Sequence, residues 1–208
     1  MINSEYINKI IVLLEAEYPE ALCSLDYATD WQLLFATRLA AQCTDERVNM
    51  VTPTLYSRYP TLEALAEAEL SELEDIIHSC GFYHSKAKDI IAASKMLLSD
   101  YNGVVPGTME ELLKLPGVGR KTANIILGDV YKKPAVVTDT HCIRLANRMG
   151  LANSKDPYKV ELSLRELIPE DKQTDFCHRL VLHGRKYCTA RKPDCEHCPL
   201  RDVCIKKL

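Results

Sequence analysis

The sequence predicts an all-α fold, and three observations favour this class. Apolar residues recur with helical period in nearly every segment, whereas the alternation typical of strands is scarce. The connecting segments, such as residues 102–107, are short. Two stretches carry the capping-box pattern that starts helices, Ser71 with Glu74 and Thr108 with Glu111.

The expected helices follow one another along most of the chain. The periodicity places them at residues 3–18, 30–42, 45–59, 62–69, 71–79, 84–101, 108–114, 120–131, 139–150, 157–167 and 171–186. The two capping boxes mark the starts of the helices near 71 and 108, and Asp139 is a natural N-cap. Pro53 is expected to kink or split the third helix, because proline removes a hydrogen-bond donor. Residues 188–208 are too cysteine-rich and irregular for an ordinary helix.

The composition is that of a soluble globular protein whose charge is unevenly spread. The chain has 208 residues, of which 47% are hydrophobic, and its formal net charge is −3, so any basic surface for nucleic acid must be local. Residues 61–75 carry six acids and no base, whereas residues 185–192 carry four bases and no acid. No apolar run approaches the ~20 residues of a membrane span, and the N-terminus is a poor signal peptide. We therefore expect a cytoplasmic protein without a membrane partner.

The nine cysteines are unevenly distributed, with four of them close together near the C-terminus. Five are scattered, and an odd number cannot all pair, which favours a reducing cytosol with one metal site over a disulfide framework. The other four, Cys188, Cys195, Cys198 and Cys204, have the spacing Cys-x6-Cys-x2-Cys-x5-Cys. Four thiolates so close together indicate a metal site. The spacing alone leaves zinc and an iron–sulfur cluster both open.

A glycine-containing connection joins the helices expected at 108–114 and 120–131. In Leu115-Pro116-Gly117-Val118-Gly119, two glycines let the backbone turn tightly and approach a ligand. The turn also aims free N–H groups, with the start of the next helix, at one point where phosphate would bind. The alternative is a plain helix–turn–helix connector.

Lys121 and Asp139 are the candidate catalytic residues. Lys121 follows Arg120 in the first turn of a helix, where the positive helix end disfavours the ammonium form and favours a neutral, nucleophilic amine. It could equally be a solvated lysine or a phosphate contact like Arg120. Asp139, as an N-cap, stays ionised, which suits charge stabilisation or proton acceptance as well as simple capping.

Taken together, these motifs resemble the endonuclease III branch of the helix-hairpin-helix DNA glycosylases. The resemblance rests on LPGVGRKTAN at 115–124, Thr138-Asp139-Thr140-His141 and the four cysteines, and it extends to residues 41–45 and 81–87. It implies a bifunctional base-excision enzyme that removes oxidised or ring-fragmented pyrimidines from double-stranded DNA and cleaves abasic sites. In that chemistry Lys121 attacks the sugar C1′ with the help of Asp139, and a Schiff base permits β-elimination.

The resemblance also assigns roles to other residues. Gln42 would fill the gap left by the flipped base, and Phe82 would be a wedge at the opposite strand, where the family often has leucine. The alternatives are a polar residue at a helix end for Gln42 and an ordinary core aromatic for Phe82. Asp45 and His141 match positions near the pocket, and Thr138 replaces a more common aliphatic residue. The four cysteines would hold a structural [4Fe–4S] cluster, and Arg191 and Lys192 between them would contact DNA phosphates. For both basic residues, a solvated loop is the alternative.

The resemblance further implies two helical domains, residues 24–134 with the hairpin and residues 1–23 with 135–208 around the cluster, and an active site in the cleft between them. The protein is expected to act as a monomer, nucleoid-associated in a prokaryote. Two rival functions remain. One is a monofunctional adenine or mismatch glycosylase of the same superfamily, which would lack the lysine. The other is a non-enzymatic iron–sulfur protein that binds DNA and senses redox state.

Overall fold

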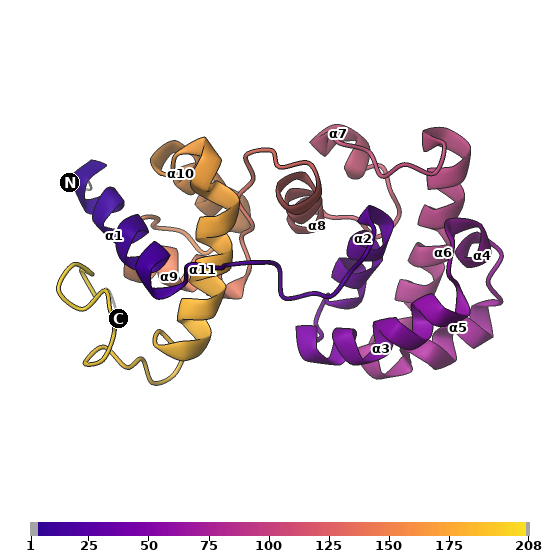
Figure 1. The fold of residues 1–208 in the computed structure, drawn as a ribbon, viewed down its shortest axis with the longest axis horizontal. Coiled ribbons are helices and arrows are strands. Elements are labelled where there is room, and N and C mark those ends of the chain that lie inside the picture. Colours follow the sequence, from indigo (N-terminus) through magenta and orange to yellow (C-terminus); the bar gives the residue numbers. More distant parts are fainter. Residues whose placement is uncertain (1–3, 207–208) are drawn as a thin grey trace. The chain divides into compact units, whose positions relative to one another are not determined.

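A computed structural model describes residues 4–206 and divides the chain into two compact units (Figure 1). One unit is Ser24–Tyr131, and the other combines the chain up to Cys23 with the chain from Lys132 onward. Over residues 4–206 every regular element is a helix and none is a strand, which confirms the all-α prediction. Within the same residues, no helix has both the length and the apolar character needed to cross a membrane.

The unit Ser24–Tyr131 is built around helices α2 and α6. Almost the whole of α2 is buried, and it contacts α3, α6 and α8, whereas α6 also packs against α4 and α5. A helix that is buried on most of its faces belongs to the centre of its domain. The elements are α2 (Asp30–Leu39), α3 (Asp45–Arg58), α4 (Leu62–Ala66), α5 (Leu70–Ile77), the 3-10 turn His78–Cys80, α6 (Tyr83–Tyr101), α7 (Met109–Leu112), α8 (Arg120–Ile125) and the π turn Ile126–Val130.

The second unit is centred on α11, which packs against α9 and α1, while α9 also contacts α10. Its elements are α1 (Ser4–Glu17), α9 (Thr140–Arg148), α10 (Pro157–Leu167), the 3-10 turn Glu170–Lys172 and α11 (Gln173–Lys186). Apolar residues such as Phe176 and Leu180 of α11 form its core. The chain from 187 to 206 is irregular, as expected, and is anchored by the fully buried Leu200.

Most predicted helices are present, with several boundaries corrected. The helix expected at 30–42 ends at Leu39, because the chain turns there and Gln42 adopts a left-handed conformation with φ 55°. The helix expected at 62–69 ends at Ala66, and only residues 120–125 of the helix expected at 120–131 are α-helical before the π turn. The other ends agree or differ by one or two residues, as frayed ends do. Residue 3, the expected start of the first helix, lies outside the described residues.

Two local predictions need correction. The third helix is not split at Pro53, since α3 continues through it from Asp45 to Arg58. The apolar face of α3, including Val51 and Leu55, is buried and holds the helix together despite the missing donor. The capping box at Ser71 is also absent, because α5 begins earlier, at Leu70, without a side-chain cap.

The capping site at Thr108 is confirmed. The Thr108 side chain accepts a hydrogen bond from the Glu111 N–H, and its hydroxyl donates to the Glu111 carboxylate at 2.6 Å. This cap fixes the start of α7 and so the entry into the glycine-containing connection.

Candidate DNA-binding and catalytic site

The connection Leu115–Gly119 forms a tight hairpin that leaves the start of α8 accessible. The Val118 N–H donates to the Leu115 carbonyl at 3.1 Å, and Gly117 has a left-handed φ of 73°. Gly119 is the N-cap of α8, and no side chain caps this helix. The Leu115 side chain is only 2% exposed, so any DNA contact of this residue would be through its backbone. N–H groups at an uncapped helix start are suited to bind an anion.

The hairpin rests on an ion pair that the sequence pattern did not reveal. Arg38 of α2 binds Asp89 of α6, with its Nη2 2.6 Å from the Asp89 Oδ2. A Cβ on Gly117 would lie 2.6 Å from Arg38 Nε and 2.7 Å from Asp89 Oδ2. Gly117 is therefore required twice, for its positive φ and for the close approach of its backbone to the pair.

Lys121 is exposed and is the second residue of α8. It thus lies in the first turn after the hairpin, where the sequence placed it. Its neighbours Ala123 and Asn124 on the same short helix are buried and hold α8 against the unit. The amine is therefore carried by a fixed helix while remaining accessible to a ligand.

Two further turns of this unit display candidate DNA-contacting residues in left-handed conformations. Gln42 has φ 55° and is exposed, and Phe82 has φ 49° with 69% of its surface exposed. Phe82 is therefore not a core aromatic, which was the alternative to the wedge. Asp45, in the first turn of α3, accepts a hydrogen bond from the Ser24 hydroxyl, which fixes its side chain.

Asp139 and His141 belong to the other unit, at the start of α9. The Asp139 Oδ1 accepts a hydrogen bond from the Cys142 N–H at 2.7 Å, which confirms the predicted N-cap. Oδ2 takes no part in this bond. The Nδ1 of His141 lies 3.1 Å from the Arg144 guanidinium, and a Cβ on Gly184 of α11 would lie 2.5 Å from the same nitrogen. The His141 side chain is therefore packed tightly against α11.

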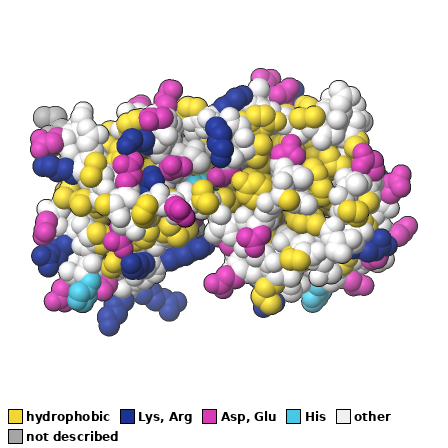
Figure 2. All heavy atoms as spheres, in the orientation of Figure 1, with side chains coloured by type: hydrophobic (Ala, Val, Ile, Leu, Met, Phe, Trp, Pro, Cys, Tyr) yellow, Lys and Arg dark blue, Asp and Glu magenta, His cyan; other side chains and the backbone are white. Residues whose placement is uncertain are grey.

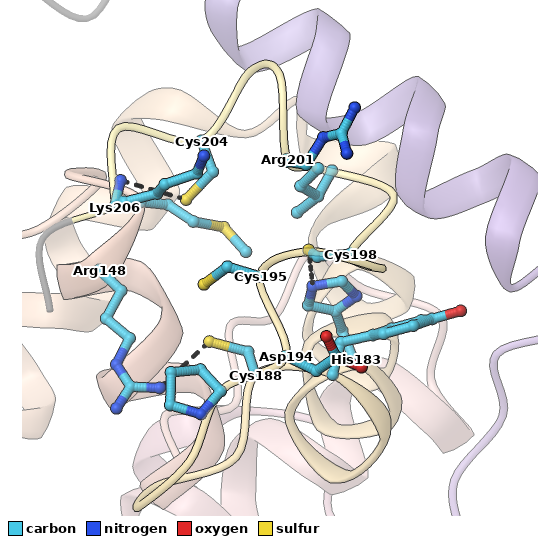
Figure 3. Close-up of a pocket in the computed structure, with 13 residues that line it drawn as sticks. Arg148, His183, Cys188, Asp194, Cys195, Cys198, Arg201, Cys204 and Lys206 are labelled. Atoms are coloured by element: carbon cyan, nitrogen blue, oxygen red, sulfur yellow. Dashed lines mark hydrogen bonds between the residues drawn. The ribbon is translucent and has the colours of Figure 1, made fainter.

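The four C-terminal cysteines line one cavity of this unit, together with residues of α9 and α11 (Figure 3). Burial raises the pKa of the Cys198 and Cys204 thiols, and the negative charges of the neighbouring cysteines raise both pKa values further. Four thiolates in one partly buried space repel one another unless a cationic centre compensates them. The donor set of four cysteine sulfurs therefore fits a thiolate-bound metal centre.

Three side chains outside the cysteine motif hold this segment in place. Arg148 donates from Nη1 to the Cys188 Sγ at 3.3 Å and to the Thr189 carbonyl at 2.8 Å, and from Nη2 to the Ala190 carbonyl at 2.9 Å. Arg144 donates to the Cys188 carbonyl at 3.0 Å. The Nε2 of His183, a buried residue of α11, lies 3.4 Å from the Cys198 Sγ. None of the three belongs to a recognisable spacing, so the sequence alone did not indicate them.

Arg191 and Lys192 are exposed on the segment that Arg148 holds. Figure 2 shows Lys and Arg side chains gathered along the edge of this unit where the end of α11 and the following segment lie. Because the net charge of the chain is negative, any basic surface for nucleic acid must be local, and these side chains form such a surface.

Comparison with known proteins identifies the family. Residues 35–170 match the HhH-GPD superfamily of base excision DNA repair proteins, and residues 188–204 match the iron-sulfur binding domain of endonuclease III. The chain is 49% identical to endonuclease III of Synechocystis sp., over 94% of this chain and 90% of that protein. The chain belongs to the endonuclease III family. The family relative from Bacillus subtilis is 40% identical over 98% of this chain and 94% of its own length.

The fold agrees with this membership. A solved structure of a trapped endonuclease III–DNA covalent intermediate, in an estranged-adenine complex, matches with a TM-score of 0.93 and 38% identity. The match covers 99% of this chain and 97% of that chain. The C-terminal segment is accordingly an iron–sulfur binding domain.

Proposed function

We propose that this chain is a bifunctional DNA glycosylase and abasic-site lyase of base excision repair. Its substrates are oxidised or ring-fragmented pyrimidines in double-stranded DNA, together with abasic sites. The observation that carries the proposal is Lys121, an accessible amine in the first turn of a fixed helix directly after an uncapped hairpin. A monofunctional relative would have no amine at this position.

In the proposed reaction the Lys121 amine attacks C1′ of the damaged nucleotide while the base leaves. Asp139 accepts the proton that the lysine loses and stabilises the positive charge that develops on the sugar. The C1′–O4′ bond then breaks, with O4′ taking up a proton, and the sugar ring opens to the Schiff base. The Schiff base lowers the barrier to loss of the C2′ proton, and the 3′ phosphate departs by β-elimination. The N-cap bond holds the Asp139 carboxylate in a fixed orientation.

The remaining candidates bind and open the duplex. The hairpin residues Gly117, Val118 and Gly119, with Arg120, contact the backbone phosphates. Gln42 fills the vacancy left by the flipped base, and Phe82 inserts as a wedge at the opposite strand. Asp45 and His141 border the base pocket.

The metal centre is proposed to be a [4Fe–4S] cluster bound by Cys188, Cys195, Cys198 and Cys204, with a structural role. The four cysteines line one cavity, and the match of residues 188–204 to the iron-sulfur binding domain of endonuclease III supports an iron–sulfur cluster over zinc. Bound there, the cluster fixes the segment that presents Arg191 and Lys192 to DNA.

We further propose that the two units are the domains expected at 24–134 and at 1–23 with 135–208. The protein would act as a monomer in the bacterial cytoplasm, associated with the nucleoid.

Borohydride trapping on a duplex with one abasic site tests the enzymatic proposal. Wild type should form a covalent adduct that resists denaturation, because the reductant converts the Schiff base to a stable amine. Lys121→Gln should bind the same duplex but form no adduct, and the matched variant Lys114→Gln, an exposed lysine before the hairpin, should trap normally. Undiminished trapping by Lys121→Gln would remove Lys121 from the nucleophile role. No adduct with wild type would contradict the lyase activity and would leave the two rival functions, a monofunctional glycosylase and a redox-sensing protein.

A further inference from the structure

Lys86 is fully buried, with 0% of its surface exposed, and yet lies near the start of α6 among apolar residues. Its Nζ donates to the Leu39 carbonyl at 2.8 Å and to the Cys80 carbonyl at 2.9 Å. A buried ammonium is costly unless its donors are satisfied, so these two bonds must be maintained for the residue to be tolerated.

Each of the two carbonyls that Lys86 binds lies just before a turn that carries one of the residues proposed to enter DNA. Leu39 is the last residue of α2, and the turn with Gln42 follows it. The Cys43 N–H, which would continue the helix by donating to Leu39, donates instead to Ala40 at 3.1 Å. Lys86 therefore satisfies a carbonyl that the turn has released, at the negative end of the α2 dipole.

The second carbonyl belongs to Cys80, the last residue of the 3-10 turn, and Gly81 and Phe82 follow it directly. Gly81 has φ 69° and Phe82 has φ 49°, so the backbone reverses within two residues. The Phe82 carbonyl in turn accepts the Lys86 N–H at 3.2 Å. The Lys86 side chain thus links the carbonyl that precedes the Gln42 turn to the carbonyl that precedes the Phe82 turn.

We propose that Lys86 is a positioning residue that sets the spacing between Gln42 and Phe82, so that both side chains enter an opened duplex together. The proposal rests on the DNA-opening roles proposed above for these two residues. Lys86 itself does not touch DNA, because it is buried behind both turns. Two insertions on a rigid frame require less ordering on binding than two independent loops.

The test compares affinity for a duplex containing a tetrahydrofuran abasic analogue with affinity for the undamaged duplex. Lys86→Met keeps the length and apolar stem but removes both bonds. It should reduce the ratio of the two affinities about tenfold, because the two turns lose the bonds that hold them at a fixed spacing and must be ordered on binding. Lys88→Met, an exposed lysine of the same helix, should leave the ratio unchanged. If Lys86→Met does not fold, as judged by circular dichroism, Lys86→Gln takes its place, because its shorter side chain cannot reach both carbonyls and should reduce the ratio in the same direction.

A mutant cycle separates positioning from a general structural effect. In a Gln42→Ala, Phe82→Ala background, Lys86→Met should reduce the ratio by less than about twofold, because the residues through which it acts are gone. A full additional loss in that background, or an unchanged ratio in the single variant, would overturn the proposal. If Gln42→Ala, Phe82→Ala alone discriminates as well as wild type, both the opening roles and the Lys86 role fall. Lys121-dependent trapping would still decide the enzymatic function separately.

Discussion

Gly117→Ala should destabilise the unit Ser24–Tyr131, and the structure gives the magnitude. Alanine in the left-handed conformation found at Gly117 costs about 1–2 kcal/mol. Its methyl group would also lie 2.6 Å from Arg38 Nε and 2.8 Å from Asp89 Cβ. Overpacking of this kind costs about 1–3 kcal/mol, so the free energy of unfolding should fall by about 2–5 kcal/mol.

The matched control is Gly119→Ala, two residues along the same hairpin. Gly119 has φ −103°, and a Cβ there would meet no atom within 4 Å. Its stability should therefore change by less than about 1 kcal/mol, since a weaker N-cap is offset by a stiffer unfolded chain. The added methyl group nevertheless stands where a phosphate would approach the start of α8. Gly119→Ala should thus lose DNA affinity about tenfold, the equivalent of one charge-assisted hydrogen bond.

Thermal unfolding and DNA binding measured on the same preparations distinguish the two variants. A chain of this size loses about 3 °C of Tm per kcal/mol, so Gly117→Ala should melt roughly 6–15 °C below wild type. It should also bind DNA more weakly, because the hairpin moves. A Tm within 1 °C of wild type would refute the packing of Gly117 on the Arg38–Asp89 pair. An equal loss of Tm in Gly119→Ala would refute the contrast between the two glycines.

Three further predictions concern the other unit. Cys198→Ser should lose iron, sulfide and visible absorbance and should unfold at lower temperature, because metal binding and local folding are coupled; colourless wild type with stoichiometric zinc would contradict the cluster. Asp139→Asn should keep the Tm of wild type, since Asn is a good N-cap. Its rate of base removal on a thymine-glycol duplex should fall more than its rate of strand cleavage at a preformed abasic site. Wild-type rates for both reactions would mean that Asp139 is a cap only. Arg191→Ala with Lys192→Ala should flatten the log–log salt dependence of DNA binding by about one to two units, and an unchanged slope would mean that these side chains face solvent.

Local chemistry explains why so much was predictable from the sequence. The period of apolar residues gave the helical class, Asp139 and Thr108 were correctly expected as caps, and the two glycines marked the hairpin. In each case the signal lies within a few residues of the feature it predicts. Where burial decides instead, local rules fail: α3 continues through Pro53, and α5 starts before its capping box.

The unpredicted residues act over long sequence separations. Arg38 binds a partner 51 residues away, and Arg148 reaches the cysteine segment 40 residues further on. A charged residue on an otherwise apolar helix face is the one sequence signal that could have indicated a buried charged residue with distant partners. Lys86 shows this signal, since Ile90, Ala93 and Leu97 on the same face of α6 are buried.

The strained residues of the unit Ser24–Tyr131 indicate how its binding surface is maintained. Among its described non-glycine residues, Gln42, Phe82 and Asn102 have positive φ. Asn102 is the C-cap of α6, and asparagine tolerates this conformation, so local chemistry accounts for it. Gln42 and Phe82 have no such preference, and each costs about 1–2 kcal/mol in this conformation. Replacing either by glycine would relieve the strain but would remove the side chain proposed to enter DNA. We infer that the strain is balanced from behind the two turns by the buried Lys86. Its bonds to Leu39 and Cys80 would connect a polar group in the core to the geometry of the proposed DNA-binding surface.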